Sequence, residues 1–413
     1  MNQYFVDLHV HIGRDSSGRP VKVTGARNLT AENIARECAT RKGIDLVAVV
    51  DCASRRVIAD IERMLESGEM IEAPGGGMRC LDTTTVLLGA EVEVACPRSG
   101  SAHYLSLFSS LPLMRRFSDD LGKHMRNVDL STQKARMSPI DLATATRSLG
   151  GLFIVAHAFT PHRSLYGTCA RRMSDVFEGV ERSLVSGVEL GLSADADMAD
   201  RISELEPFTF VSNSDAHSLP KIGREYNIVQ MESPCFDELA LALSRTGGRR
   251  VVANYGLDPR LGKYHLSACE ECGARFHAAR HDVRGNDATA VPSAPRGNPG
   301  RALCPHCGSA RIVKGVSDRV EEIADTAQPV RPAHRPPYHY QIPLEFIPGV
   351  GPRAMASLID AFGTEMAVLH RAKALELATI VGETLARRIV LARAGELDIQ
   401  AGGGGAYGKP VYG

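Results

Sequence analysis

Seven short apolar runs alternate with helix-like stretches over the first 255 residues of the chain. The runs are residues 4–12, 45–51, 84–94, 103–108, 152–157, 187–192 and 208–215. Continuous apolar strands that alternate with helices are typical of a parallel sheet covered on both faces. Because there are seven such repeats, the pattern fits a closed or nearly closed barrel better than an open sheet.

Helix signals lie between these runs. Thr30 is expected to cap a helix that ends at Gly43. Ser138 and Pro139 supply the N-cap and first position of another, which ends near Gly150.

The pattern changes after residue 255, and we divide the chain into five parts. A cysteine-containing region is followed by a segment with four prolines, by a helical region, and by a Gly-rich tail that is expected to be disordered. The predicted parts are a barrel (1–255), a zinc-binding domain (256–325), a Pro-rich linker (326–340), a helical domain (341–399) and the tail (400–413).

Composition narrows the class of protein. The 413 residues are 44% hydrophobic, and Lys+Arg and Asp+Glu both number 48, so no global charge attracts nucleic acid or membrane. The first residues do not resemble a signal peptide, and no apolar run is long enough to span a membrane. We therefore expect a cytoplasmic protein without a membrane partner. Its ten cysteines are expected to be reduced, with Cys38, Cys52, Cys80, Cys96, Cys169 and Cys235 as core or surface thiols.

Imidazoles and carboxylates recur in these apolar runs, mostly at their ends. His9 and His11 are two residues apart, as are Asp215 and His217, and this spacing on an extended chain directs both side chains to one face. The carboxyl ends of barrel strands meet at one face, where active sites lie. The complete set is His9, His11, Asp51, Glu91, His103, His157, Glu189, Asp215 and His217.

This set exceeds one tetrahedral coordination shell, so it predicts two or three metals with a carboxylate such as Glu91 between them. Paired metals can neutralise a phosphodiester, activate water and stabilise the leaving oxygen, so no Ser or Cys nucleophile is needed. Arg14 follows the first motif directly and is a candidate for holding the phosphate, or else a surface residue.

Two further motifs follow the barrel. Cys269, Cys272, Cys304 and Cys307 form two CxxC pairs, the pattern of a structural four-thiolate zinc site, with an inserted loop around 280–300. Residues 344–363 resemble a helix-hairpin-helix motif, in which Gly349, Val350 and Gly351 would offer backbone N–H groups to a DNA phosphate. A degenerate second copy is expected at 380–392.

The motifs "DLHVH", "GAEVE", "AHYL", "VAHAFTP" and "SNSDAH" resemble, in order, those of the polymerase and histidinol phosphatase (PHP) superfamily. The resemblance implies a distorted (β/α)7 barrel whose metal centre hydrolyses phosphate esters. It implies metal ligands at His9, His11, Glu91, His103, His157, Glu189, Asp215 and His217. The family usually has a histidine shortly after Asp51, whereas this chain reads "VVDCASRR". A third metal would then be weak or completed by Asp51, Cys52 or water, and two metals are favoured.

The whole order of parts resembles the endonuclease Q family. That resemblance implies a metal-dependent DNA repair endonuclease, with Zn, Mn or Mg in the barrel, that cleaves 5′ to deaminated bases (uracil, hypoxanthine, xanthine) or abasic sites. Asp215, Asp51 and Arg14 are the candidate catalytic residues, and a replication or repair protein is a candidate partner of the tail. A small-molecule phosphatase of the PHP type and a DNA exonuclease remain alternatives.

Overall fold

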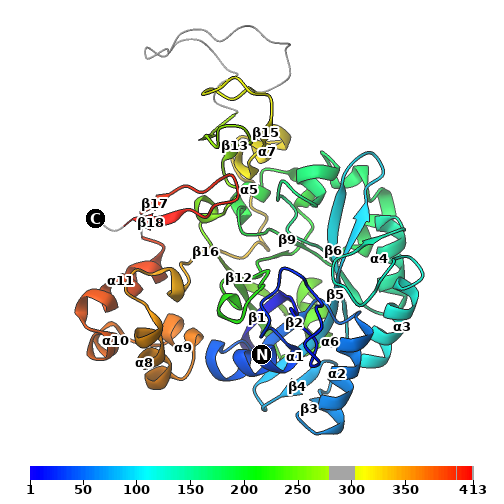
Figure 1. The fold of residues 1–413 in the computed structure, drawn as a ribbon, viewed down its shortest axis with the longest axis vertical. Coiled ribbons are helices and arrows are strands. Elements are labelled where there is room, and N and C mark those ends of the chain that lie inside the picture. The colour runs from blue at the N-terminus through cyan, green and yellow to red at the C-terminus, as the bar shows by residue number, and fades with distance from the viewer. Residues whose placement is uncertain (279–302, 397, 412–413) are drawn as a thin grey trace.

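The structure is a computed structural model, and it describes residues 1–278, 303–396 and 398–411. Its centre is a curled sheet in which seven strands follow the order β10-β9-β8-β6-β5-β2-β1 (Figure 1). An isolated parallel bridge between Val10 and Ala216 links the two ends of this arc. The strands are β1 (Asn2–Val10), β2 (Leu46–Val49), β5 (Thr84–Ala95), β6 (Ser101–Phe108), β8 (Leu152–Val155), β9 (Gly187–Glu189) and β10 (Phe210–Val211). The expected α/β barrel of the PHP type is therefore confirmed.

One strand departs from the expected parallel sheet. β6 runs antiparallel to both of its neighbours, β5 and β8, whereas β1, β2 and β5 are parallel to one another, as are β8, β9 and β10. Only residues 96–100 connect β5 to β6. Because a parallel connection needs a crossover of a dozen or more residues, so short a link forces a hairpin.

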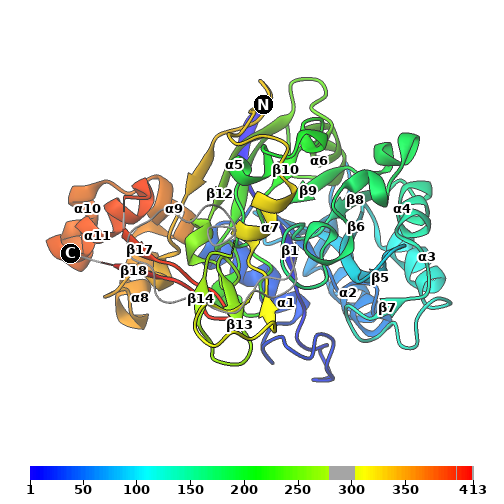
Figure 2. The same ribbon diagram turned by 90° about the horizontal axis from the view of Figure 1, so that it is seen from above.

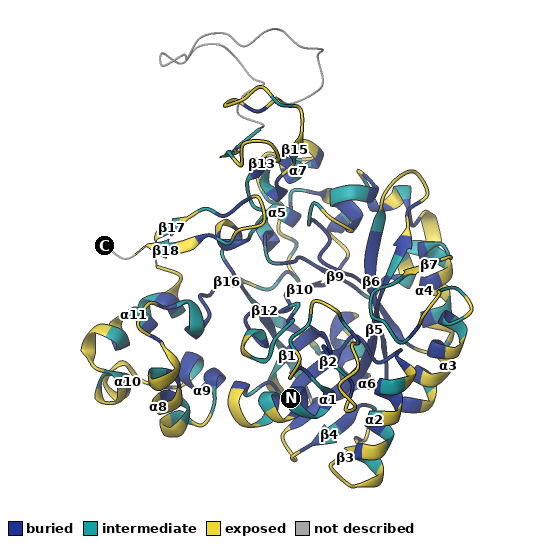
Figure 3. Cartoon of the chain, viewed as in Figure 1, coloured by how far each residue is buried: buried dark blue, intermediate teal, exposed yellow. Residues whose placement is uncertain are grey.

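Helices cover the outside of the sheet, with their buried faces turned inward and their outer faces exposed (Figure 3). Thr30 caps the first helix by accepting a hydrogen bond from the Asn33 amide, and that helical segment ends at Gly43 as expected. Ser138 and Pro139 also begin a helix as expected. The barrel helices are α1 (Ala31–Glu37) with a further helical turn (Cys38–Lys42), α2 (Arg55–Glu66), α3 (Leu111–Leu121), α4 (Pro139–Ser148), α5 (Ala196–Ala199) and α6 (Phe236–Leu243).

Further strands extend this sheet at its edges. β11 pairs antiparallel with β1, β12 pairs with β11, and β16 pairs with β12. Their bounds are β11 (Tyr226–Met231), β12 (Arg250–Gly256) and β16 (Tyr338–Tyr340), and shorter strands are β3 (Met70–Glu72), β4 (Met78–Cys80) and β7 (Lys134–Ala135). β16 comes from the segment assigned to the linker, so that segment is part of the sheet.

The cysteine-containing region and the helical region lie at different sides of the barrel. The former has β13 (Ser267–Cys269), β14 (Arg275–Phe276), β15 (Ile312–Val313) and α7 (Val316–Ile323). The latter has α8 (Pro352–Phe362), α9 (Glu365–His370), α10 (Ala374–Val381) and α11 (Glu383–Ala394), on the side opposite α3 and α4 (Figures 1 and 2). A buried contact of 2.9 Å between Lys42 Nζ and Glu365 Oε1 joins the helical region to the barrel. The expected loop around 280–300 lies outside the described residues, and the five-part division stays a prediction.

The Gly-rich tail is ordered over its described residues, so the expectation of disorder was wrong there. β17 (Asp398–Gln400) and β18 (Lys409–Val411) pair antiparallel, and the turn between them lies against residues 260–266. A hairpin that pairs its own backbone and also docks on another segment satisfies polar groups that a free tail would leave to water.

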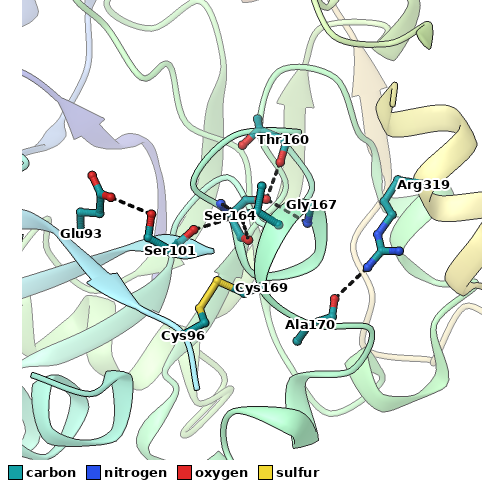
Figure 4. The surroundings of a disulfide bond; sticks show 10 residues. Glu93, Cys96, Ser101, Thr160, Ser164, Gly167, Cys169, Ala170 and Arg319 are labelled. Carbon is teal, nitrogen blue, oxygen red and sulfur yellow. Dashed lines mark hydrogen bonds between the residues drawn. A yellow bond between two sulfur atoms is a disulfide. The ribbon is translucent and has the colours of Figure 1, made fainter. Parts of the chain in front are cut away.

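Two cysteines expected to be free thiols form a disulfide instead. Cys96 lies just after β5 and Cys169 lies in the turn at 165–169, 73 residues later, and their bond ties the β5–β6 hairpin to that turn (Figure 4). The Ser164 hydroxyl caps the same turn by accepting from the Gly167 amide at 3.0 Å. Cys38, Cys52, Cys80 and Cys235 are buried free thiols. Among the described residues, no helix has the length and apolar character needed to cross a membrane.

Arg335 of the Pro-rich segment gives a direct test of how firmly that segment is packed. Its guanidinium lies 2.9 Å from Asp200, and both side chains are 1% exposed. We expect Arg335→Met to destabilise the fold by about 3–5 kcal/mol, because it leaves a buried carboxylate without a partner. Urea unfolding measures this change.

A matched control is Arg331→Met, since Arg331 pairs with Asp197 at the surface, where its side chain is 53% exposed. Its loss should change the free energy of unfolding by about 0–1 kcal/mol. Equal, small effects of the two substitutions would show that residues 326–340 are a loosely attached linker.

Candidate metal centre

The first group of candidate ligands comprises His9, His11 and Asp215. The two histidines lie at the end of β1, and Asp215 lies just after β10, which the Val10–Ala216 bridge holds beside β1. Asp215 Oδ1 is 3.6 Å from His9 Nε2 and 3.3 Å from His11 Nε2. One donor atom from each residue lies within 4.8 Å of the others, which is close enough for one ion.

The second group comprises Glu91, His103 and His157. Glu91 Oε1 is 2.7 Å from His103 Nδ1 and 3.1 Å from His157 Nε2. His103 lies near the start of β6, yet it reaches the same face as residues at the ends of the parallel strands. The reversed direction of β6 is the cause, because the start of an antiparallel strand lies beside the ends of its neighbours.

Glu91 joins the two groups. Its Oε1 is 3.5 Å from His9 Nε2, and its Oε2 is 3.5 Å from His11 Nε2. Burial would raise the pKa of Glu91, but His103 and Lys22 hold that pKa well below its ordinary value, so the carboxylate is charged at neutral pH. A charged carboxylate between two sets of imidazoles has the composition and position of a bridging ligand.

A buried ring nitrogen without a hydrogen-bond partner supports a metal between the candidate ligands. Nε2 of His9 and Nε2 of His103 are buried and have no hydrogen-bond partner. Buried polar atoms without partners are rare in folded proteins. An ion would explain the His9 nitrogen, which lies between Glu91 and Asp215, whereas the His103 nitrogen lies 3.8 Å from Glu93. The residues present therefore fit two divalent ions, one for each group.

Asp51 and Glu189 contact the histidines from behind, and Glu189 also lines the cleft. Asp51 accepts from His11 Nδ1 at 3.0 Å and from the Ile12 amide at 2.7 Å. Glu189 accepts from His9 Nδ1 at 3.0 Å and from the His157 amide at 2.8 Å. Carboxylates in such positions fix the ring orientation and tautomer of ligating histidines. The geometry thus gives both residues a positioning role, while their assignment as a ligand or a catalytic residue stays a prediction.

His217 and Cys52 differ from the two groups. The His217 ring is 4.5 Å from the His11 ring at the mouth of the site. Burial and the nearby His11 lower the pKa of His217 to about 4, so it is neutral and able to bind a metal. The Cys52 thiol donates a hydrogen bond to the Val49 carbonyl at 3.2 Å. The residue that the sequence suggested as a substitute ligand therefore bonds to the backbone.

Two candidate ligands have a strained backbone. His157 has a φ of 27° and Asp215 a φ of 44°, values that residues other than glycine rarely adopt. Such strain persists only where surrounding contacts fix it. Buried Asp7 supplies some of these contacts by accepting from the Ser214 amide at 3.1 Å and the Gly223 amide at 3.0 Å. Arg224 Nε donates to the Ser214 carbonyl at 2.8 Å.

Both groups open into a cleft of about 470 Å³. Arg14, the predicted phosphate-holding residue, is not among the residues that line it. The cationic and aromatic residues that do are His162, Lys22, Arg163, Lys221, Arg224, Lys263, Tyr264 and Tyr407. Sequence reasoning assigned none of these residues to the site. Most of them lie in or beside a recognised motif, but Lys263, Tyr264 and Tyr407 lie far from any of the barrel motifs.

Lys22 lies closest to the predicted ligands. Its Nζ is 3.1 Å from Glu91 Oε2. Burial would lower the pKa of Lys22, but the Glu91 and Asp51 carboxylates raise it above its ordinary value, so the side chain carries a positive charge.

The four cysteines of the two CxxC pairs come together as predicted. Cys269 Sγ lies 3.6 Å from Cys307 Sγ, and Cys272 Sγ lies 3.6 Å from Cys304 Sγ. The four sulfurs lie within 4.8 Å of one another, an arrangement that could hold zinc. A glycine with positive φ follows the second cysteine of each pair, Gly273 and Gly308, and permits the sharp turn of the knuckle.

The predicted hairpin lies at the exposed start of α8. Gly349 has a φ of 100°, and Gly351 is the N-cap of α8. Gly382 is the N-cap of α11 and lies in the segment of the second copy, which stays a prediction. Arg388 of α11 donates to the Pro348 carbonyl at 2.9 Å. The loop that precedes α8 is therefore bonded to α11.

Comparisons with known proteins extend these findings. A family model described as PHP-associated matches residues 195–246. The chain is 46% identical to the uncharacterized protein YqxK of Bacillus subtilis over 412 residues, which is 99% of each chain. The crystal structure of the lesion-specific endonuclease EndoQ from Pyrococcus furiosus matches with a TM-score of 0.80 and 30% identity, over 99% of this chain and 95% of that one.

A second solved structure shows endonuclease Q with a 27-mer duplex substrate that has an abasic lesion at the active site. It matches with a TM-score of 0.80 and 30% identity, over 100% of this chain and 97% of that one.

Metal content distinguishes the barrel centre from the cysteine cluster. We expect Asp215→Asn to lose one divalent ion per chain, because a neutral amide replaces the charged ligand of the first group, while zinc at the cysteines remains. Cys304→Ser should lose only that zinc and destabilise residues 256–325. Elemental analysis of the purified variants measures both losses. An unchanged metal content of folded Asp215→Asn would remove Asp215 from the centre.

Proposed function

The chain belongs to the endonuclease Q family, and from that membership we propose that it is a metal-dependent DNA endonuclease that cleaves the phosphodiester 5′ to deaminated bases or abasic sites. The observation that carries the proposal is the pair of ligand groups joined by Glu91 at the floor of a cleft with cationic walls. An endonuclease Q with 30% identity over the full length of the chain acts on a duplex with an abasic lesion.

The chemistry follows from charge. Divalent ions held by the two groups would supply positive charge against the phosphate anion and make a water more acidic. The protein contributes the fixed ligand geometry, in which Glu91 joins both groups and the strained Asp215 is held by its neighbours. Lys22 offsets part of the negative charge of the site by its contact with Glu91.

Residues around the mouth orient the substrate. Arg163 lies next to the strand-end histidines, and its guanidinium is 3.4 Å from Glu93 and 60% exposed. An exposed arginine beside the ligands can exchange this contact for a phosphate of the DNA strand. A lesion base must leave the helix stack to bring its 5′ phosphate to the floor of such a cleft.

A helix-hairpin-helix role for residues 347–351 fits the same proposal. The exposed N–H groups at the start of α8 would bind a phosphate without reading a base. The zinc cluster would be structural, because four thiolates close a tetrahedral shell and leave no position for substrate. A small-molecule phosphatase would use neither region.

One gel assay tests the central proposal. We expect the protein with Mn²⁺, Mg²⁺ or Zn²⁺ to cut an internally labelled duplex once, on the 5′ side of a single uracil, and to leave the matched undamaged duplex intact. Chelation of the metals should abolish the cut. A ladder of products from one end would instead identify an exonuclease, and an intact duplex beside a hydrolysed small phosphate ester would identify a phosphatase.

Gly351 allows a clean test of the hairpin. Its φ is −83°, and a Cβ added there meets no atom within 4 Å, so a side chain is tolerated. We expect Gly351→Asp to weaken binding to damaged and undamaged duplexes alike by about tenfold, because a negative charge faces the phosphate. The isosteric Gly351→Asn should have little effect. Fluorescence anisotropy measures both, and a loss confined to damaged DNA would contradict a nonspecific clamp.

A further inference from the structure

The glycine-rich C-terminal hairpin is fastened to the barrel side of the cysteine-containing region. Gly402 donates to the Arg260 carbonyl at 2.7 Å, Gly408 donates to Leu261 at 2.9 Å, and Gly405 donates to Lys263 at 3.0 Å. Figure 1 shows the hairpin, in red, reaching from the helices toward α5 and β13. These bonds fix the position of the turn between β17 and β18.

The glycines of this segment are required by close packing. A Cβ on Gly408 would lie 2.5 Å from the Arg260 carbonyl oxygen, and one on Gly402 would lie 2.6 Å from the Gly262 carbonyl oxygen. Both distances are shorter than real side chains allow, so the backbones can meet only through glycine. Gly402 and Gly408 therefore belong to a docking surface rather than to a flexible spacer.

Docking brings Tyr407 into the wall of the catalytic cleft. Its half-buried side chain lines the same cleft as the candidate ligands His157 and Asp215. Its hydroxyl accepts from Arg224 Nη1 at 3.0 Å. The same arginine donates to the Ser214 carbonyl, so the end of the chain contacts the loop that holds Asp215.

Cations surround the Tyr407 ring. Lys221 Nζ lies 5.8 Å and Lys263 Nζ lies 5.9 Å from its centroid, and Lys263 Nζ is also 5.1 Å from the ring centroid of Tyr264. Within the described part of the chain, neither lysine forms an ion pair, so both ammonium groups are available to an anion. A partly exposed tyrosine beside these two ammonium groups matches a nucleotide, which offers a flat base next to its phosphates.

We propose that the C-terminal hairpin forms a nucleotide subsite of the cleft, in which Tyr407 stacks on a base of the bound strand while Lys221 and Lys263 hold the neighbouring phosphates. The inference rests on the proposed endonuclease function and adds a named contact to it. Every base has a stacking face, so this subsite grips the strand without selecting a sequence. It also gives the tail a role within the enzyme, in place of a partner protein.

The test compares three variants of the full chain. Tyr407→Leu removes the ring, Tyr407→Phe keeps the ring and removes only the hydroxyl bonded to Arg224, and Lys409→Ala changes an exposed neighbour on β18 as a control. Each is made in the Asp215→Asn background for binding, to stop turnover, and in the wild-type background for cleavage. The probe is a fluorescein-labelled duplex with one abasic site and a 2-aminopurine beside it.

We expect Tyr407→Leu to weaken binding by about tenfold, the scale of one lost base stack, and to abolish the quenching of 2-aminopurine fluorescence. Tyr407→Phe and Lys409→Ala should retain both signals. The melting temperature and zinc content of Tyr407→Leu should equal those of the parent, which separates a lost contact from a lost fold.

Two results overturn the subsite. If Tyr407→Leu binds and quenches like the parent while the wild type cleaves the probe, the ring makes no contact with DNA. If Tyr407→Phe is as weak as Tyr407→Leu, the hydroxyl bond to Arg224 is what matters, and stacking is wrong. Failure of the proposed function looks different, because the wild type would then leave the abasic duplex uncut.

Discussion

The placement of one carboxylate governs the arrangement of the cleft floor. Glu91 lies on β5, is 4% exposed, and contacts imidazoles from β1, from β6 and from the end of β8. A buried carboxylate is stable only where positive charge and hydrogen-bond donors surround it. The sheet satisfies this condition by curling, because β1 and β8 are each two strands away from β5 and the curl brings the ends of both within reach of Glu91. The curl of the sheet and the charged state of Glu91 therefore depend on each other.

A second layer of buried acids makes this arrangement rigid. Asp51 and Glu189 each accept from the Nδ1 of a β1 histidine, so Nε2 is the atom directed at the cleft. Asp7 lies beneath them and holds the loop in which Asp215 has a positive φ. Burying so many polar groups is unfavourable unless each is bonded, and the barrel interior provides those bonds. Local strain at Asp215 is thus maintained by contacts that do not themselves touch substrate.

Local sequence patterns predicted much of this arrangement, whereas contacts between residues far apart in the chain could not be predicted from them. Alternating apolar runs located the seven strands, and side chains at their ends pointed to both groups of candidate ligands, because local periodicity and strand direction decide these features. His103 was among the predicted residues although it lies near the start of its strand. The reversed direction of β6 was not predicted, because the expectation of a parallel sheet took no account of the short link after β5. The Cys96–Cys169 bond joins residues 73 apart, and no local pattern encodes such a pairing.

Tyr407 shows why composition can mislead about function. Four consecutive glycines before it are typical of a flexible segment, and the sequence offers no sign that Arg260 and Gly262 leave space for glycine alone. The cleft is built from parts far apart in the chain: ligands from β1 to β10, Lys263 from the cysteine-containing region, and Tyr407 from the C-terminus. Its positive charge is local, since the whole chain has zero net charge. A neutral protein can therefore bind a polyanion at one place, and the last residues of the chain help to define that place.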